Sequence, residues 1–129
     1  MKKILSLFVL ISFLSCNDDQ DSNSESNNTI LGRWHLVGFE QTVMYDFKTD
    51  LRYSIYSSNG EFGETETSAI PNPNPWYIEN QKIFIDLHFG NISSSELNFR
   101  NNGNVVDFLN EEGSITTTLF REGYNYSSN

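Results

Sequence analysis

Apolar and polar residues alternate along most of this chain once its first thirty residues have passed. A period of two is typical of a β-strand that buries one face, and no segment keeps the longer period of a helix. Strands are therefore predicted over 30–39, 42–48, 50–57, 76–79, 82–89, 96–100, 104–109 and 114–120, with a weaker one over 62–67.

Turn residues separate these predicted strands. An Asn-Gly pair at 59–60 is a strong signal for a tight turn, and glycine-containing turns at 101–103 and 111–113 separate the last three strands. Three prolines in the segment 70–75 remove ladder donors, so this segment is predicted to interrupt the sheet. Short strands joined by hairpins are typical of a sandwich or a barrel. A single long connection favours the barrel, and we predict a small all-β, antiparallel up-and-down barrel of about eight strands over 29–122.

The segment 1–15 has the pattern of an export signal. A basic start is followed by an apolar stretch that is too short to span a bilayer as a helix. It ends at Ser15 and Cys16, the single cysteine of the chain. A small residue before a cysteine resembles a bacterial lipobox, so we expect Cys16 to be lipidated and to anchor the chain through its acyl groups. The alternative is an ordinary secretory signal with an incidental cysteine.

The segment 16–28 is predicted to be a flexible acidic tether, because the twelve residues after Cys16 include no apolar side chain. Its acidic cluster at 18–21 resembles the export signal that sends some lipoproteins of diderm bacteria to the outer leaflet of the outer membrane. The alternative is a solvated spacer that happens to be acidic. We therefore expect a lipid anchor in the outer membrane and leave exposure at the cell surface open.

Charge and cysteine content exclude some partners. The net charge is −9, and it becomes −11 once the leader is removed, because Lys2 and Lys3 leave and no acidic residue does. Such a balance argues against nucleic acid as a partner, since nucleic acid is bound by basic patches. One cysteine can form neither an intramolecular disulfide nor a cysteine zinc site. We expect a monomer, with a frayed tail over 123–129.

The start of the predicted barrel carries a family resemblance. The segment 31–36, with Gly32 two residues before Trp34, resembles the Gly-x-Trp opening of lipocalins. The chain as a whole resembles the small lipocalin-like domains of bacterial lipoproteins over about 30–122. Two further motifs, at 45–50 and 120–121, add to this resemblance. It implies a barrel closed at one end by Gly32, Trp34 and Arg121, with the arginine packed over the tryptophan. The chain lacks the length and the disulfides of full lipocalins, so a large cavity is not implied.

Aromatic and aliphatic residues of the strands are candidates for lining the barrel. The candidate ligand-lining residues are Tyr45, Tyr53, Leu87 and Phe99. The alternative is that these side chains only fill the core, because a barrel of eight short strands has room for one small ligand at most. Trp76 and Tyr77 are candidate surface aromatics, for a sugar platform or a lid. The alternative for this pair is that it seats the proline segment on the core.

Catalytic chemistry has weak support. His35 and His88 are the two histidines, and a metal or acid–base site would need both to converge with a carboxylate such as Asp86. Exposed polar positions on half-buried strands explain the same pattern. No nucleophile elbow or phosphate loop is present in the sequence. We therefore predict no enzyme, no cofactor and no metal. The expected function is binding of a small apolar or amphipathic molecule, and the alternative is an interaction module for a protein or glycan with a filled barrel.

Overall fold

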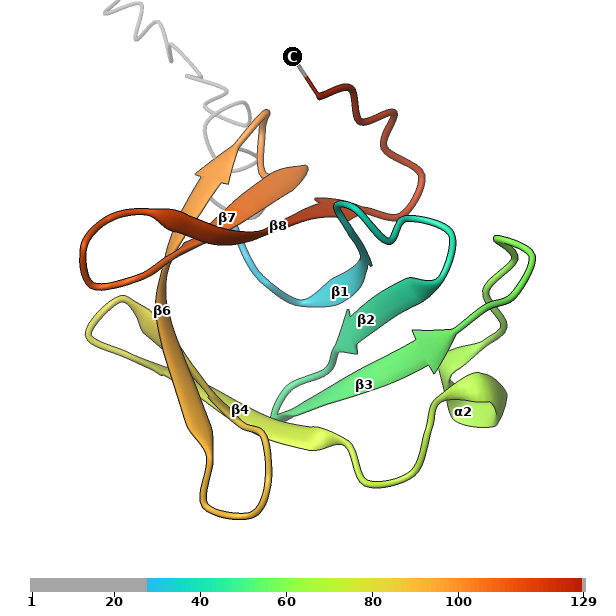
Figure 1. The fold of residues 1–129 in the computed structure, drawn as a ribbon, viewed down its shortest axis with the longest axis horizontal. Helices are drawn as coiled ribbons and strands as arrows, with labels where there is room; N and C mark the ends of the chain where they lie inside the picture. Colours follow the sequence, from blue (N-terminus) through green and yellow to red (C-terminus); the bar gives the residue numbers. More distant parts are fainter. Residues whose placement is uncertain (1–27, 129) are drawn as a thin grey trace, which may run out of the picture.

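The computed structural model describes residues 28–128, which form one closed barrel of eight antiparallel strands. The strands are β1 (Gly32–Leu36), β2 (Val43–Phe47), β3 (Leu51–Tyr56), β4 (Asn74–Glu79), β5 (Lys82–Asp86), β6 (Ile92–Arg100), β7 (Val105–Leu109) and β8 (Ile115–Arg121). Each strand pairs with the next, and β8 pairs with β1 to close the ring shown in Figure 1. The predicted fold class, a small up-and-down barrel of eight short strands, is confirmed.

Three predicted elements between residues 62 and 89 differ in the structure. The weak strand over 62–67 is wrong, because this segment contains a short helix, α2 (Thr65–Ser68). The break over 70–75 ends earlier than predicted, since β4 includes Pro75, which is exposed and lies in the shortest ladder of the barrel. The strand predicted over 82–89 ends at Asp86, because His88 and Phe89 have φ angles of 70° and 56°.

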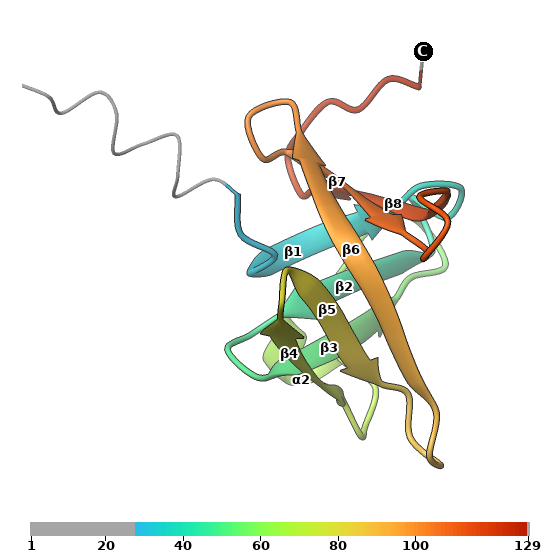
Figure 2. The same ribbon diagram turned by 90° about the vertical axis from the view of Figure 1, so that its left-hand side faces the viewer.

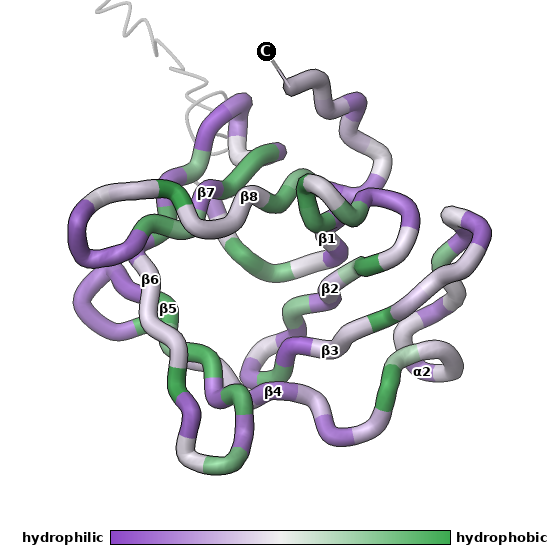
Figure 3. Tube along the Cα trace, in the orientation of Figure 1, coloured by the Kyte–Doolittle hydropathy of each residue, from purple (hydrophilic) through white to green (hydrophobic). Residues whose placement is uncertain are grey.

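The meander gives the barrel two different ends. The connections β1–β2, β3–β4, β5–β6 and β7–β8 lie at one end, which we call the open end. The chain enters β1 and leaves β8 at the other, which we call the closed end. Figure 2 shows the β1–β2 and β7–β8 turns of the open end on the right and the β2–β3 turn on the left, with β6 crossing the wall. Figure 3 shows apolar segments mainly on the strands and polar segments in turns such as β7–β8.

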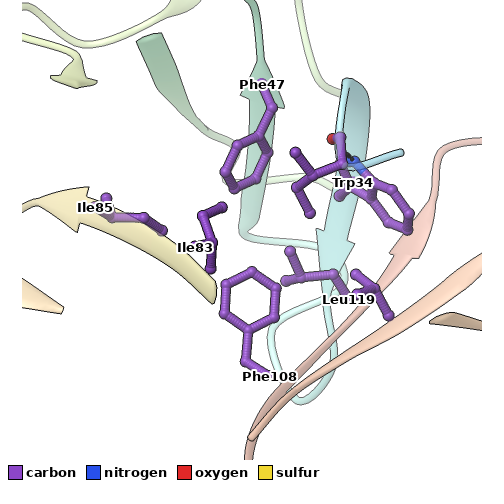
Figure 4. Packing of buried hydrophobic residues seen from close by; sticks show 8 residues of the cluster. Trp34, Phe47, Ile83, Ile85, Phe108 and Leu119 are labelled. Carbon is purple, nitrogen blue, oxygen red and sulfur yellow. Dashed lines mark hydrogen bonds between the residues drawn. The ribbon is translucent and has the colours of Figure 1, made fainter. Parts of the chain in front are cut away.

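The core fills the barrel next to its closed end. The strand register places Trp34, Phe47 and Leu119 on the same face of the sheet. All three belong to one buried cluster, so this face is the inner one. The buried members of this cluster are Ile30, Trp34, Phe47, Ile83, Ile85, Val106, Phe108 and Leu119. Figure 4 shows these side chains converging from β1, β2, β5, β7 and β8. Such interdigitation from opposite walls is what a small barrel needs for a solid interior.

A second apolar layer lies outside the barrel wall. Met44 and Ile55 are fully buried, although register places them on the outer faces of β2 and β3. The long connection between β3 and β4, including α2, covers this outer face and lies beside β3 in Figure 1. The Thr65 hydroxyl donates a hydrogen bond to the buried Asp46 carboxylate and fastens the cover. Strand β3 therefore buries apolar side chains on its outer face.

Residues 123–128 form no strand, yet they contact the barrel. The ring of Tyr126 stacks on Phe120, with centroids 4.9 Å apart and an interplanar angle of 8°. The backbone N–H of Tyr124 donates to the Arg121 carbonyl. The tail therefore contacts the outer face of β8 through the ring of Tyr126.

Candidate functional site

The closed end is sealed by a tryptophan and an arginine. Trp34 is fully buried and donates its indole N–H to the Ile30 carbonyl at 2.7 Å. The Arg121 guanidinium lies 4.2 Å from the centroid of the Trp34 ring, which is the contact implied by the lipocalin resemblance. Arg121 also donates to the carbonyls of Thr29, Leu31 and Gly103. These bonds tie the incoming chain and the β6–β7 turn across this end.

Gly32 is required by the same closure. Its φ of 115° is rarely adopted by other residues, and a Cβ built there would lie 3.3 Å from an Arg121 guanidinium nitrogen. A side chain would therefore strain the backbone and press on the arginine that covers Trp34. The glycine, the tryptophan and the arginine form one structural unit, and burial lowers the pKa of Arg121 without removing its charge.

The open half of the barrel contains a cavity of about 270 Å³. Its base is formed by core residues, among them Phe47, Phe108 and Leu119, and its wall continues to the open end. The residues that line it are Leu36, Tyr45, Phe47, Arg52, Ile85, Leu87, Ser93, Ser95, Phe108, Thr116, Thr117 and Leu119. The cavity is therefore mostly apolar, with several hydroxyl groups and one charged side chain.

That charged side chain is Arg52, whose inner position follows from register. Arg52 pairs with Phe47, and Ser54 pairs with Tyr45, so these four residues share the inner face. The Arg52 guanidinium carbon lies 4.5 Å from the centroid of the Tyr45 ring, and its Nη2 donates to Asn74 Oδ1 at 2.8 Å. Burial lowers the pKa of Arg52, yet the group stays charged at neutral pH.

One donor of Arg52 has no partner. Its Nε is buried and makes no hydrogen bond within residues 28–128, and no carboxylate of that range lies within 4.0 Å of the guanidinium. A buried polar atom without a partner is uncommon and costs free energy. Sequence reasoning missed this residue. The signal available was a basic residue alternating with apolar ones in a strand, which alone is weak because such residues usually face solvent.

The predicted ligand-lining residues separate into three groups. Tyr45 and Leu87 line the cavity. Phe99 packs against the core cluster and is not among the cavity residues. Tyr53 was expected inside and lies outside, because it pairs with Asp46 on the outer face of the wall. There it borders a groove of about 410 Å³ next to α2, together with Lys48 and residues of the proline segment.

The two candidate surface aromatics also separate. Trp76 is directed inward, meets Phe47 edge to face at 5.8 Å, and donates its indole N–H to the Lys48 carbonyl. It seats the proline segment on the core, which was the alternative interpretation. Tyr77 is half exposed on the outer face and stacks on Phe84 at 4.9 Å. Only Tyr77 of this pair therefore offers an aromatic surface.

The histidines make separate structural contacts. His35 lies on the outer face of β1 between Phe62 and Phe120, and its Nδ1 is 3.0 Å from the Glu40 carbonyl oxygen. His88 lies in the β5–β6 connection, where its backbone N–H donates to the Asp86 carboxylate. No group of three histidine, cysteine, aspartate or glutamate side chains among residues 28–128 is placed to hold a metal ion. The geometry thus gives no support to the proposed histidine–aspartate cluster.

The predicted leader, the lipidated Cys16 and the tether as far as residue 27 lie outside the described residues. Among those described, no helix has the length and apolar character needed to cross a membrane.

In comparisons with known proteins, no family model, no curated protein and no solved structure matches this chain. The sequence patterns, the fold and the geometry of the cavity are accordingly the basis for the functional proposal.

Proposed function

We propose that this chain is a lipid-anchored, lipocalin-like binding protein of the outer membrane of a diderm bacterium, and that its barrel takes up one small apolar or amphipathic molecule. The observation that carries the proposal is the cavity of about 270 Å³ above the core. Ligand sites are concave, mostly apolar and supplied with a few polar groups that fix orientation, and this cavity has that character. Its volume lies just below the usual range of about 300–1,000 Å³, which favours a small ligand.

The surroundings of the open end support the entry of an apolar molecule. Large apolar side chains are exposed around this end, and Phe89 is 98% exposed. The exposed members are Phe39, Tyr56, Leu87, Phe89 and Ile115. They come from four separate segments that the meander brings to one end, so the entrance is apolar although the chain is strongly acidic. An apolar rim lowers the cost of transferring an apolar molecule from a membrane or carrier.

A second candidate function is an interaction module. The outer face of β4 and β5 presents the Tyr77–Phe84 stack, and Ile92 next to it is 62% exposed. Exposed aromatic patches are common in surfaces that bind proteins or glycans. This reading does not use the cavity, so the two functions respond to different substitutions. Tyr77→Ser would remove the aromatic stack from this outer patch and leave the cavity intact.

Native mass spectrometry of the protein mixed with lipid extract from its host tests the binding function. We expect a retained small-molecule adduct on the wild type, and none on Ser93→Phe, because Ser93 lines the cavity and a phenyl ring would fill it. Ser94→Phe is the matched control, since Ser94 is on the outer face of the same strand. A bare protein mass for the wild type, or equal adducts on both variants, would contradict the proposal.

The membrane anchor has its own test. Cys16→Ser is expected to move the protein from the membrane fraction to the soluble fraction, because no acyl group can then be attached. Detergent fractionation followed by detection of the barrel measures this directly. Membrane association that persists in the variant would remove the lipid anchor from the proposal while leaving the ligand-binding function to be judged separately.

A further inference from the structure

Arg52 indicates the chemical class of the ligand. Its Nε has no hydrogen-bond acceptor in the described part of the chain, although the guanidinium is held in place by Tyr45 and Asn74. The orientation of the Arg52 guanidinium is therefore fixed before any ligand binds. A fixed, desolvated cation facing an apolar cavity attracts an anion more strongly than one in water, because the local dielectric constant is low.

Another arginine of this protein shows what such a group looks like when paired. Arg100 donates its Nε to Asp107 Oδ2 at 2.9 Å and its Nη2 to Oδ1 at 3.3 Å, so a carboxylate receives two parallel bonds. The hydrogen bond that Arg100 donates to Asp107 raises the pKa of Arg100, whereas burial lowers the pKa of Arg52. The planar fork of arginine matches a carboxylate in this geometry. At Arg52 the chain supplies no such group within residues 28–128.

The rest of the cavity limits the charge of the ligand. Arg52 is the one basic residue among those that line it, and none of the lining residues is acidic. One cation balances one negative charge, and a second would remain uncompensated in a chain of net charge −9. Hydroxyls of Ser93, Ser95 and Thr117 are available for further polar contacts.

We propose that the cavity binds a monoanionic amphiphile whose carboxylate pairs with Arg52 and whose short apolar body rests on Phe47, Ile85 and Leu119. This inference rests on the binding function proposed above and adds the class of ligand to it. The carboxylate pairs with the guanidinium of Arg52, which lines the cavity, and the apolar body covers the floor of the cavity. One molecule thereby contacts both the fixed cation and the apolar base of the cavity.

Calorimetric titration with sodium octanoate and with 1-octanol at pH 7 tests the proposal, since the two probes share a chain length and differ in charge. The wild type is expected to bind octanoate about tenfold more tightly than octanol, because hydrogen bonds to charged groups contribute more than neutral ones. In Arg52→Met the preference for octanoate should disappear while the affinity for octanol is kept. Lys82→Met is the matched control, since Lys82 lies on the outer face of β5 and its loss changes net charge equally.

The outcomes separate the two proposals. If neither probe binds the wild type, both the binding function and the ligand class are overturned. If both probes bind and Arg52→Met weakens neither, binding stands and the role of Arg52 is overturned. Arg52→Lys keeps the charge without the fork and serves where Arg52→Met does not fold. Arg52→Lys is expected to lower the affinity for octanoate and not that for octanol. An equal fall in both affinities would contradict the proposal.

Discussion

The two ends of the barrel each place an arginine over an aromatic ring, and the two arginines differ in what they donate to. At the closed end, Arg121 covers Trp34 and donates to three backbone carbonyls. Inside the open half, Arg52 covers Tyr45, donates to Asn74 and leaves its Nε without an acceptor. The cation–ring contact is similar at both places, at 4.2 Å and 4.5 Å.

The difference separates a structural role from a binding role. A side chain that donates to several acceptors of its own chain stabilises the fold, whereas a buried donor without an acceptor costs stability. The closed end therefore resembles a finished core, and the cavity resembles a site that awaits a ligand. Substitutions at the two ends should behave differently, and the first three predictions below run from the largest expected effect to the smallest.

Trp34→Ala should have the largest effect on the closed end. It removes a fully buried indole that packs in the core and carries Arg121, so the free energy of unfolding is expected to fall by about 3–5 kcal/mol. Urea denaturation measures the loss. Phe89→Ala is the control, since that ring is 98% exposed. A comparable fall in the free energy of unfolding for Phe89→Ala would show that the loss in Trp34→Ala does not come from burial.

Asp107→Asn tests the pair of Arg100 and Asp107, with which Arg52 was compared above. Burial alone would raise the pKa of Asp107, but hydrogen bonds from Arg100 and Thr118 outweigh it and hold the pKa below its usual value of 3.8. The ionised carboxylate thus stabilises the fold above about pH 4, and this contribution is lost as the pH falls through the lower pKa of the folded state.

The variant should lose about 1–3 kcal/mol at pH 7 and lack the acid-dependent part of the stability curve. Urea denaturation between pH 2 and about pH 7 compares it with the wild type. Parallel curves for the two proteins would mean that the Arg100–Asp107 pair does not set the acid sensitivity.

Gly32→Ala should have a smaller effect at the closed end. The alanine must adopt a φ of 115°, and its Cβ lies 3.3 Å from a guanidinium nitrogen of Arg121. The free energy of unfolding is therefore expected to fall by about 1–3 kcal/mol. Gly90→Ala is the matched control, because Gly90 also has a positive φ, of 80°, and meets nothing within 4 Å. Thermal unfolding of both variants isolates the contact with Arg121. Equal losses would assign the effect to backbone strain alone.

The closed end could be predicted from the sequence because its signals are local. Gly32 and Trp34 are two residues apart on one strand, and the resemblance supplied Arg121 as the partner. Alternation and turn residues were enough for the all-β barrel, since they depend on neighbours along the chain. The start of β6 at Ile92 was missed, because three serines follow it and strand pairing with β5, rather than local propensity, holds them extended.

The open half could not be predicted in the same way. Tyr53 and Ile55 alternate with Arg52 and Ser54, and the sequence favours the apolar set as the inner one. The inner set is instead Arg52 and Ser54, because the segment between β3 and β4 covers the outer face and buries Ile55 there. Which face of a strand is covered depends on a distant connection. The size of the cavity likewise depends on how side chains from opposite walls meet.

The most direct measurement compares Arg121→Met and Arg52→Met by urea denaturation, each with and without sodium octanoate. Without octanoate, Arg121→Met should lose about 2–4 kcal/mol, since three carbonyls lose their donor, whereas Arg52→Met should lose nothing or become more stable. Octanoate should stabilise the wild type and Arg121→Met more than it stabilises Arg52→Met. Equal losses in both variants, with octanoate stabilising both to the same extent, would contradict the division of roles between the two arginines.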